Sequence, residues 1–172
     1  MSVRSTPIVT AWGFAALQRE VKRLWQQRAE VTQALAAAAA EGDRSENAEY
    51  IYRKKELRAL DRRIRYLQRR MPHLQVVRER PVDEQRVRFA AWVLLEAPDG
   101  RQACHRLVGP DETGLHPGGI SIDAPLARAL LGRAEDDVVR LTAPGGRQQW
   151  HLVQVRYQPP EDEPRPPKWD AC

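Results

Sequence analysis

The stretch EGDRSENAEY, residues 41–50, separates two long runs of apolar residues with the same spacing. In both runs apolar side chains recur at alternating intervals of three and four, which is typical of a coiled-coil seam. The first seam, with one polar slot, consists of Phe14, Leu17, Val21, Leu24, Arg28, Val31, Leu35 and Ala38. The second, also with one polar slot, consists of Tyr50, Arg53, Leu57, Leu60, Ile64, Leu67, Met71 and Leu74.

The two seams match if the chain reverses at about Arg44. Ala38 then faces Tyr50, Phe14 faces Leu74, and every pair between them keeps the same sum of residue numbers, as an antiparallel register requires. We therefore expect residues 1–75 to form an antiparallel coiled-coil arm. Its first helix, from about Ala11 to Glu41, should be about 45 Å long at about 1.5 Å per residue.

The sequence changes character after Met71. Prolines at 72 and 81 interrupt a helix, so residues 76–85 are expected to be a linker. Residues 86–158 contain two pairs of strand-like segments, with a short strand, turn and helix between them, and predict a small α+β domain with an antiparallel sheet. The tail, 159–172, is rich in proline and charge, and we expect it to be disordered.

Composition excludes several classes of protein. No run of apolar residues approaches the length of a membrane span, and the N-terminus lacks the apolar core of a signal peptide, so we expect a cytoplasmic protein. We also expect it to be a monomer. The two cysteines and four histidines show no metal-ligand spacing. The 28 Lys and Arg residues against 23 Asp and Glu favour an anionic partner.

Two acidic residues between the seams allow two interpretations. Asp43, followed three residues later by Glu46, fits a capping box at the start of the second helix. The same carboxylates are ligands that Mg²⁺ prefers, but two of them on an exposed tip cannot form a tight site alone. Such a pair can complete a site inside a partner that already holds a metal.

Four segments resemble the bacterial Gre transcript-cleavage factors, most closely those of the GreB type. They are GDRSENAEY (42–50), RKKELRALDRRIRYL (53–67), VGPDE (108–112) and ISIDAPLARALLG (120–132). The resemblance covers roughly residues 6–158 in order. It implies a coiled-coil arm that enters the secondary channel of RNA polymerase, and an FKBP-like domain that docks at the channel rim.

The resemblance also implies roles for particular residues. Asp43 and Glu46 would reach the polymerase active centre and help hold a catalytic Mg²⁺ and a water, so that backtracked RNA is cut. The protein would not be an enzyme by itself and would hold no cofactor of its own. The basic patch that contacts the RNA 3′ segment would consist of Arg53, Lys54 and Lys55. The polymerase-docking residues would be Ile122, Asp123 and Pro125.

Two features depart from the family pattern. Ala124 stands where the family usually has serine, and TGLHPGG (113–119) replaces a more polar stretch. Two other functions compete with the Gre assignment. A basic-zipper type of nucleic-acid binder would join arginines to heptads, although here the basic residues overlie the seam. A Gre-related channel-binding inhibitor would bind polymerase but carry a changed tip.

One stripe of basic residues is expected on the solvent face of the second helix. Its members, spaced three and four apart, are Lys55, Arg58, Arg62, Arg65 and Arg69. For the distal arginines a solvated face is the simpler interpretation.

Overall fold

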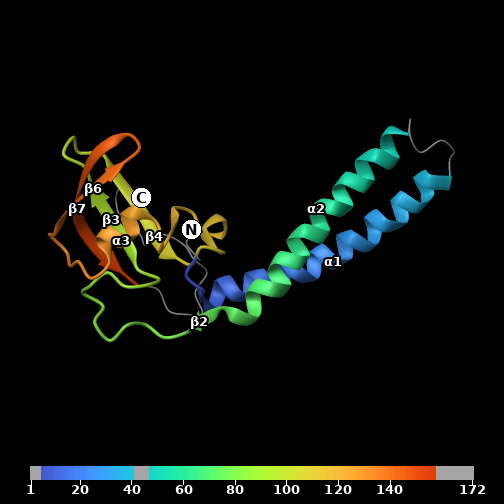
Figure 1. Cartoon of the computed structure of the whole chain (residues 1–172). Coiled ribbons are helices and arrows are strands. Elements are labelled where there is room, and N and C mark those ends of the chain that lie inside the picture. The colour runs from blue at the N-terminus through green and yellow to red at the C-terminus, as the bar shows by residue number, and fades with distance from the viewer. Residues whose placement is uncertain (1–4, 41–46, 158–172) are drawn as a thin grey trace. The chain divides into compact units, whose positions relative to one another are not determined.

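The structure, a computed structural model, describes residues 5–40 and 47–157. Its elements are shown in Figure 1. The chain divides into two compact units: Ala15–His73 forms one, and Met1–Phe14 together with Leu74–Cys172 forms the other.

The first unit is the predicted helical hairpin. Helix α1 spans Ala11–Ala40 and helix α2 spans Ala48–Arg70, and the two run antiparallel (Figure 1). Every predicted seam position is buried or half-buried, whereas the predicted outer stripe of α2 is exposed at all of its positions. The heptad spacing and the antiparallel direction are confirmed.

Ion pairs between the helices explain the polar slot in the first seam. The Arg28 Nε donates to Asp61 Oδ1 at 2.7 Å, and Arg63 donates two hydrogen bonds to Glu20 at 2.7 and 3.0 Å. Each pair joins α1 to α2, so each stabilises the hairpin. The contribution of such half-exposed pairs is modest, about 0–1 kcal/mol each.

Asn47 begins α2. Its backbone is extended, and its side-chain oxygen accepts from the Tyr50 N–H at 3.0 Å, as an N-cap does. Its side-chain amide donates to the Ala38 carbonyl at 3.0 Å and ties the cap to the end of α1. The capping-box interpretation of Asp43 is therefore wrong for α2, because Asn47 is the residue that directly precedes the first helical turn. Asp43 and Glu46 themselves lie outside the described residues.

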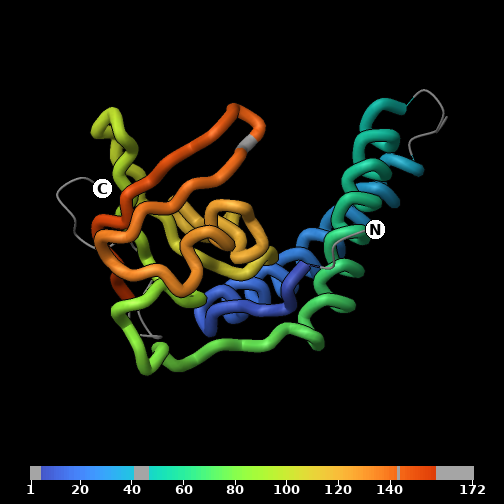
Figure 2. Tube along the Cα trace, turned by 60° about the vertical axis from the view of Figure 1, so that its left-hand side comes forward, coloured from blue at the N-terminus to red at the C-terminus, as the bar shows by residue number. Residues whose placement is uncertain are grey.

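A five-stranded sheet forms the centre of the second unit, in the order β5-β4-β3-β7-β6. Figure 2 shows the backbone trace of the chain, coloured by residue number. Its strands are β3 Trp92–Glu96, β4 Gln102–Val108, β5 Gly119–Ser121, β6 Val138–Ala143 and β7 Gly146–Arg156. The two predicted hairpins are confirmed as β3-β4 and β6-β7. The sheet is mixed and not purely antiparallel, because β5 pairs with β4 in parallel. The connection through the 3-10 helix Thr113–Leu115 lets the chain re-enter the sheet in the direction of β4.

Both faces of β3 are covered. Val93 and Leu95 belong to the main core, which helix α3 (Pro125–Leu130) covers with Ala127 and Leu130. The alternate residues, Trp92 and Leu94, form a second buried cluster on the opposite face, as the period of two in a strand requires.

The N-terminal segment packs in this second unit. Strand β1 (Ile8–Thr10) pairs in parallel with β2 (Gln75–Val77), which follows the 3-10 helix Met71–His73. The sequence predicts that this segment belongs to the arm, but its described part, up to Phe14, belongs to the second unit. Residues 76–77, expected to be linker, are part of strand β2. Within 5–40 and 47–157 no helix combines the length and apolarity that crossing a membrane needs.

Candidate functional site

The predicted basic patch lies on the first two turns of α2, and its three members differ. The Arg53 Nε donates to Glu49 at 2.7 Å and its Nη1 donates to Glu56 at 3.1 Å. The hydrogen bond that Arg53 donates to Glu49, and next the one that it donates to Glu56, raise the pKa of Arg53. Two carboxylates of its own helix therefore compensate the charge of Arg53, and this residue is poorly placed to bind an anion without exchanging partners.

Lys54 and Lys55 are the exposed cations of the patch. The Lys54 Nζ lies 5.7 Å from the centre of the Tyr50 ring, a cation–π contact that leaves the charge uncompensated. Among the described residues, no carboxylate lies within ion-pair distance of Lys55. The positive field of the patch thus comes mainly from these two lysines. Ile51 and Tyr52, next to them, expose 54% and 58% of their surface, which adds apolar area beside the charges.

The predicted docking residues lie in the turn between β5 and α3. Asp123 is largely engaged within the domain: its carboxylate accepts from the backbone N–H of Thr6 at 2.8 Å and from the Thr6 hydroxyl. This carboxylate therefore holds the N-terminal segment. Ile122 is half-buried, and the side chain of Pro125, at the first turn of α3, is exposed.

The structure thus brings the predicted residues together in two groups. Arg53, Lys54 and Lys55 share one stretch of α2, while Ile122, Asp123 and Pro125 share one turn in the other unit. The tip acids belong to neither described group. The described residues contain no cluster of three or more His, Cys, Asp or Glu side chains able to hold a metal ion.

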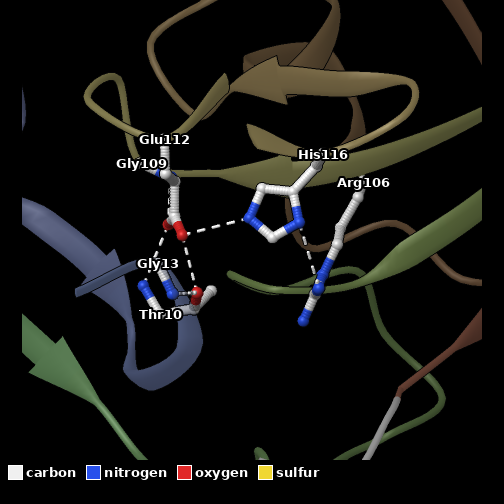
Figure 3. A network of polar contacts seen from close by, with 6 residues as sticks. All are labelled: Thr10, Gly13, Arg106, Gly109, Glu112 and His116. Carbon is white, nitrogen blue, oxygen red and sulfur yellow. Dashed lines mark hydrogen bonds and ion pairs between the residues drawn. The ribbon is translucent and has the colours of Figure 1, made fainter. Parts of the chain in front are cut away.

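Sequence analysis missed a buried polar network centred on Glu112, shown in Figure 3. The Glu112 carboxylate is completely buried and accepts from the Thr10 N–H at 2.9 Å and the Thr10 hydroxyl at 2.6 Å. It also accepts from the Gly109 N–H at 2.9 Å and lies 3.2 Å from His116 Nε2. The network joins β1 to the loop that follows β4.

Protonation within the network follows from its donors. Arg106 Nη1 lies 3.3 Å from His116 Nδ1, and since a guanidinium can only donate, Nδ1 must accept. His116 Nε2 then carries the proton and donates to Glu112. Burial raises the pKa of Glu112, but the hydrogen bonds from His116, Thr10 and Gly109 outweigh burial and lower it below its usual range. Glu112 is therefore a carboxylate at neutral pH.

Two glycines allow these contacts. A Cβ on Gly13, in the first turn of α1, would lie 1.8 Å from Glu112 Oε2. A Cβ on Gly109 would lie 1.9 Å from the Ile8 carbonyl oxygen. The VGPDE segment thus serves the packing of β1. An acidic residue after Gly-Pro-Asp is typical of an exposed turn. Only the contact between Glu112 and strand β1 could have revealed this role.

Matches to known protein families cover nearly the whole chain. The family model described as "Transcription elongation factor, N-terminal" (GreA_GreB_N) matches residues 7–76, and "Transcription elongation factor, GreA/GreB, C-term" matches residues 82–157. The chain is 53% identical over 155 residues to transcription elongation factor GreB of Pseudomonas aeruginosa, covering 90% of this chain and 92% of that protein. It is 51% identical over 156 residues to GreB of Xanthomonas axonopodis pv. citri, with 90% and 93% coverage.

Among solved structures, the chain is similar to GreA factor homolog 1 of Thermus thermophilus, with 24% identity, a TM-score of 0.41 and coverage of 87% and 97%. The family assignment depends on the sequence matches. They do not favour the basic-zipper or the inhibitor alternative. Two family models in the expected order and relatives about half identical over nine-tenths of the chain show that it belongs to the GreA/GreB family of transcription elongation factors.

Proposed function

We propose that this protein binds bacterial RNA polymerase through the secondary channel and stimulates cleavage of backtracked nascent RNA. The observation that carries the proposal is the match of both Gre family models, with about 50% identity to GreB proteins over most of the chain. The helical hairpin supports it, since α1 has 30 residues and a length of about 45 Å at about 1.5 Å per residue. The protein acts as a cytoplasmic monomer.

Asp43 and Glu46 are the residues that would hold Mg²⁺ together with the polymerase. Carboxylate oxygens fit the ligand preference of this ion, and the described residues offer no competing cluster. When bound, the metal would supply Lewis-acid activation of water and stabilise the charge that develops on the phosphate. The contribution of this chain is to present two acids on a narrow arm. It is therefore an activator of the polymerase and not an enzyme by itself.

Lys54 and Lys55 are proposed to contact the RNA 3′ segment. Their exposure and the lack of a described acidic partner for Lys55 support this role, whereas the ion pairs of Arg53 with Glu49 and Glu56 favour a supporting role for that residue. Ile122 and Pro125 are proposed to contact the polymerase. Asp123 would act there chiefly by holding the turn and the N-terminal segment in place.

The experiment is RNA cleavage by purified polymerase stalled in a backtracked complex. The Asp43→Asn/Glu46→Gln protein should bind polymerase with unchanged affinity but leave cleavage at the rate of polymerase alone, because it lacks metal-binding charge at nearly constant size. The surface variant Asp99→Asn is the control and should cleave like the wild type. Wild-type cleavage by the double variant would contradict the role of the tip, and RNA cutting by the protein without polymerase would contradict its role as an activator.

A further inference from the structure

Strand β6 is an edge of the five-stranded sheet, and within residues 5–40 and 47–157 only β7 pairs with it. The Leu152 N–H donates to the Asp137 carbonyl at 2.8 Å, just before β6 begins. In an antiparallel pair such bonded positions alternate with non-bonded ones. The N–H and C=O groups that point away from β7 are therefore those of Val138, Arg140 and Thr142.

The residues of β6 favour the addition of another strand at this edge. Its sequence, VVRLTA, contains β-branched residues and no proline, and Val138 is 42% exposed. A row of unpaired N–H and C=O groups is a template for pairing with a further strand. No role proposed above uses this edge, which shares no residue with the turn that contains Ile122 and Pro125.

Two arginines lie on the face of the hairpin β6-β7 that points away from the core. Arg140 pairs with Gln149, and Thr142 pairs with Arg147. Because cross-strand partners and alternate residues of a strand share a face, Arg140 and Arg147 lie on the same face. Val139, the next residue along β6, belongs to the main core and therefore marks the opposite face.

The positive charge on this face is uncompensated. Arg140 and Arg147 are both exposed, and the Arg140 Nε donates to the neutral side chain of Gln149 at 3.0 Å. In the part of the chain that the structure describes, no carboxylate lies within ion-pair distance of either arginine. Residues 138–156 contain three arginines and no Asp or Glu. A hollow of about 570 Å³ lies here and is lined by Arg140, Leu141, Thr142, Arg147, Gln148 and Gln149.

Backbone chemistry and charge together select the partner. The open edge needs both donors and acceptors, which an extended polypeptide supplies. The phosphate backbone of a nucleic acid supplies acceptors and would leave the carbonyls of the edge unpaired. A second copy of β6 would bring two Arg140 side chains close together, and like charges on neighbouring strands are destabilising. Acidic side chains at alternate positions of an added strand would instead share the face of Arg140 and Arg147.

We propose that the free edge of β6 is a docking site for an extended acidic segment of a partner protein, which adds to the sheet as a further strand. Hydrogen bonds to Val138, Arg140 and Thr142 hold its backbone, and the two arginines select acidic side chains. The proposal goes beyond RNA cleavage and does not depend on the proposed function.

The test is NMR of the isotope-labelled full chain without polymerase. The probe is the capped peptide Glu-Thr-Glu-Val-Glu-Thr, and the control peptide has Gln in place of every Glu. Bound at near saturation, the acidic peptide should slow hydrogen exchange of the Arg140 and Thr142 amides by about tenfold. The Leu141 N–H should not change, because by the same alternation it already bonds to β7.

Two variants separate the contributions of charge and backbone. Arg140→Gln/Arg147→Gln should weaken binding of the acidic peptide about three- to tenfold and leave binding of the Gln peptide unchanged. Arg58→Gln/Arg62→Gln, which removes the same charge from the exposed stripe of α2, is the matched control and should bind like the wild type.

Thr142→Pro removes one outward N–H without removing a bond to β7, a position where an edge strand accepts proline. It should abolish the protection of the Arg140 amide. Slow exchange of Leu141 reports that the hairpin remains folded in this variant, and if it does not, the arginine variant with the two peptides decides.

Three results would overturn the proposal. One is the absence of any response of β6 to millimolar acidic peptide. Another is a shift of the Arg140 and Arg147 signals without slower amide exchange, which would show a charge contact and no strand addition. The third is slow exchange of Arg140 and Thr142 before any peptide is added that disappears on dilution, which would assign the edge to a second copy of this chain.

Discussion

Glu112 is a buried carboxylate whose donors come from β1 and from the loop after β4. Replacing it with Gln keeps the shape but removes the charge and places an amide donor among donors. We expect Glu112→Gln to lower the free energy of unfolding by about 1–3 kcal/mol at pH 7. Urea unfolding of the full chain measures this loss.

The loss of stability caused by Glu112→Gln should depend on pH, and the pKa of Glu112 gives the direction of this dependence. The pKa of Glu112 in the folded protein lies below the ordinary value of 4.5, so its stabilising contribution is complete above that pH and is lost as pH falls through the folded pKa. The difference between wild type and Glu112→Gln should therefore narrow in acid. Asp99→Asn, at the surface, should change stability little. A difference that stays constant below pH 4.5 would show that shape and not charge matters at this position.

Gly109 is required because the Ile8 carbonyl approaches its Cα closely. The added methyl of Gly109→Ala would lie 1.9 Å from that oxygen, so β1 or the loop must move. We expect a loss of about 1–3 kcal/mol in the free energy of unfolding, as for other overpacked sites. Gly114→Ala, in the same loop but with no neighbouring atom within 4 Å of its new Cβ, is the matched control and should be nearly neutral. Equal losses in both variants would contradict the steric explanation.

Helix α2 begins at Asn47, which makes two contacts that can be separated. Asn47→Ala removes the cap of Tyr50 N–H and the bond to the Ala38 carbonyl, whereas Asn47→Asp keeps a good cap and loses only the second. We expect Asn47→Ala to destabilise the hairpin by about 1–2 kcal/mol and Asn47→Asp by less. Thermal melting followed by circular dichroism at the helical band measures both. Equal melting of Asn47→Ala and the wild type would show that the cap adds nothing.

The hairpin was predictable because its information is local and periodic. Seam spacing predicted the buried faces of α1 and α2, and the reversal of the chain between two matching seams predicted their antiparallel direction. The pairing of individual seam positions, such as Val31 with Leu57, stays a prediction. The strand pairs around the turns at 98–100 and 144–146 were predictable for the same reason, since each pairs neighbours in the chain.

The remaining pairings could not be predicted because they are short and distant in sequence. Strand β1 has three residues and pairs with β2, from which the whole arm separates it in the sequence. Strand β5, also three residues long, pairs with β4 in parallel. Segments of this length carry no period. The candidate site shows the same difference. The exposure of Lys55 was predictable from its outer heptad position, whereas the pairing of Asp123 with Thr6 needed the tertiary structure.

The two units of the chain carry different proposed tasks, RNA contact on the arm and docking on the second unit. Within the basic patch, Arg53 differs from Lys54 and Lys55 because it is ion-paired with carboxylates of its own helix. We expect Lys54→Gln/Lys55→Gln to reduce cleavage of RNA backtracked by many nucleotides more than of RNA backtracked by two or three, because each lost phosphate contact weakens the hold on the longer strand. Arg53→Gln should have a smaller effect, since Glu49 and Glu56 already bind that side chain. Cleavage rates on short and long backtracked complexes check this, and an equal loss on both would assign the lysines to the arm or the metal site.

A test of the proposed docking surface needs a variant that alters the surface but not the packing beneath it. Asp123→Arg fails this requirement, because it would also release Thr6. Pro125→Glu meets it, since Pro125 is exposed at the first turn of α3, where an acidic residue is well tolerated. We expect Pro125→Glu to weaken polymerase binding at least about tenfold, or about 1.4 kcal/mol, while the free energy of unfolding changes little. Thr6→Val is the complementary control. It removes the hydrogen bond of the Thr6 hydroxyl to Asp123 but changes none of residues 122–125, so its effect should appear in stability more than in affinity. Displacement of labelled wild-type protein from polymerase measures the affinities. If Pro125→Glu binds as tightly as the wild type, the docking surface lies outside this turn, and the contact between Asp123 and Thr6 serves folding alone.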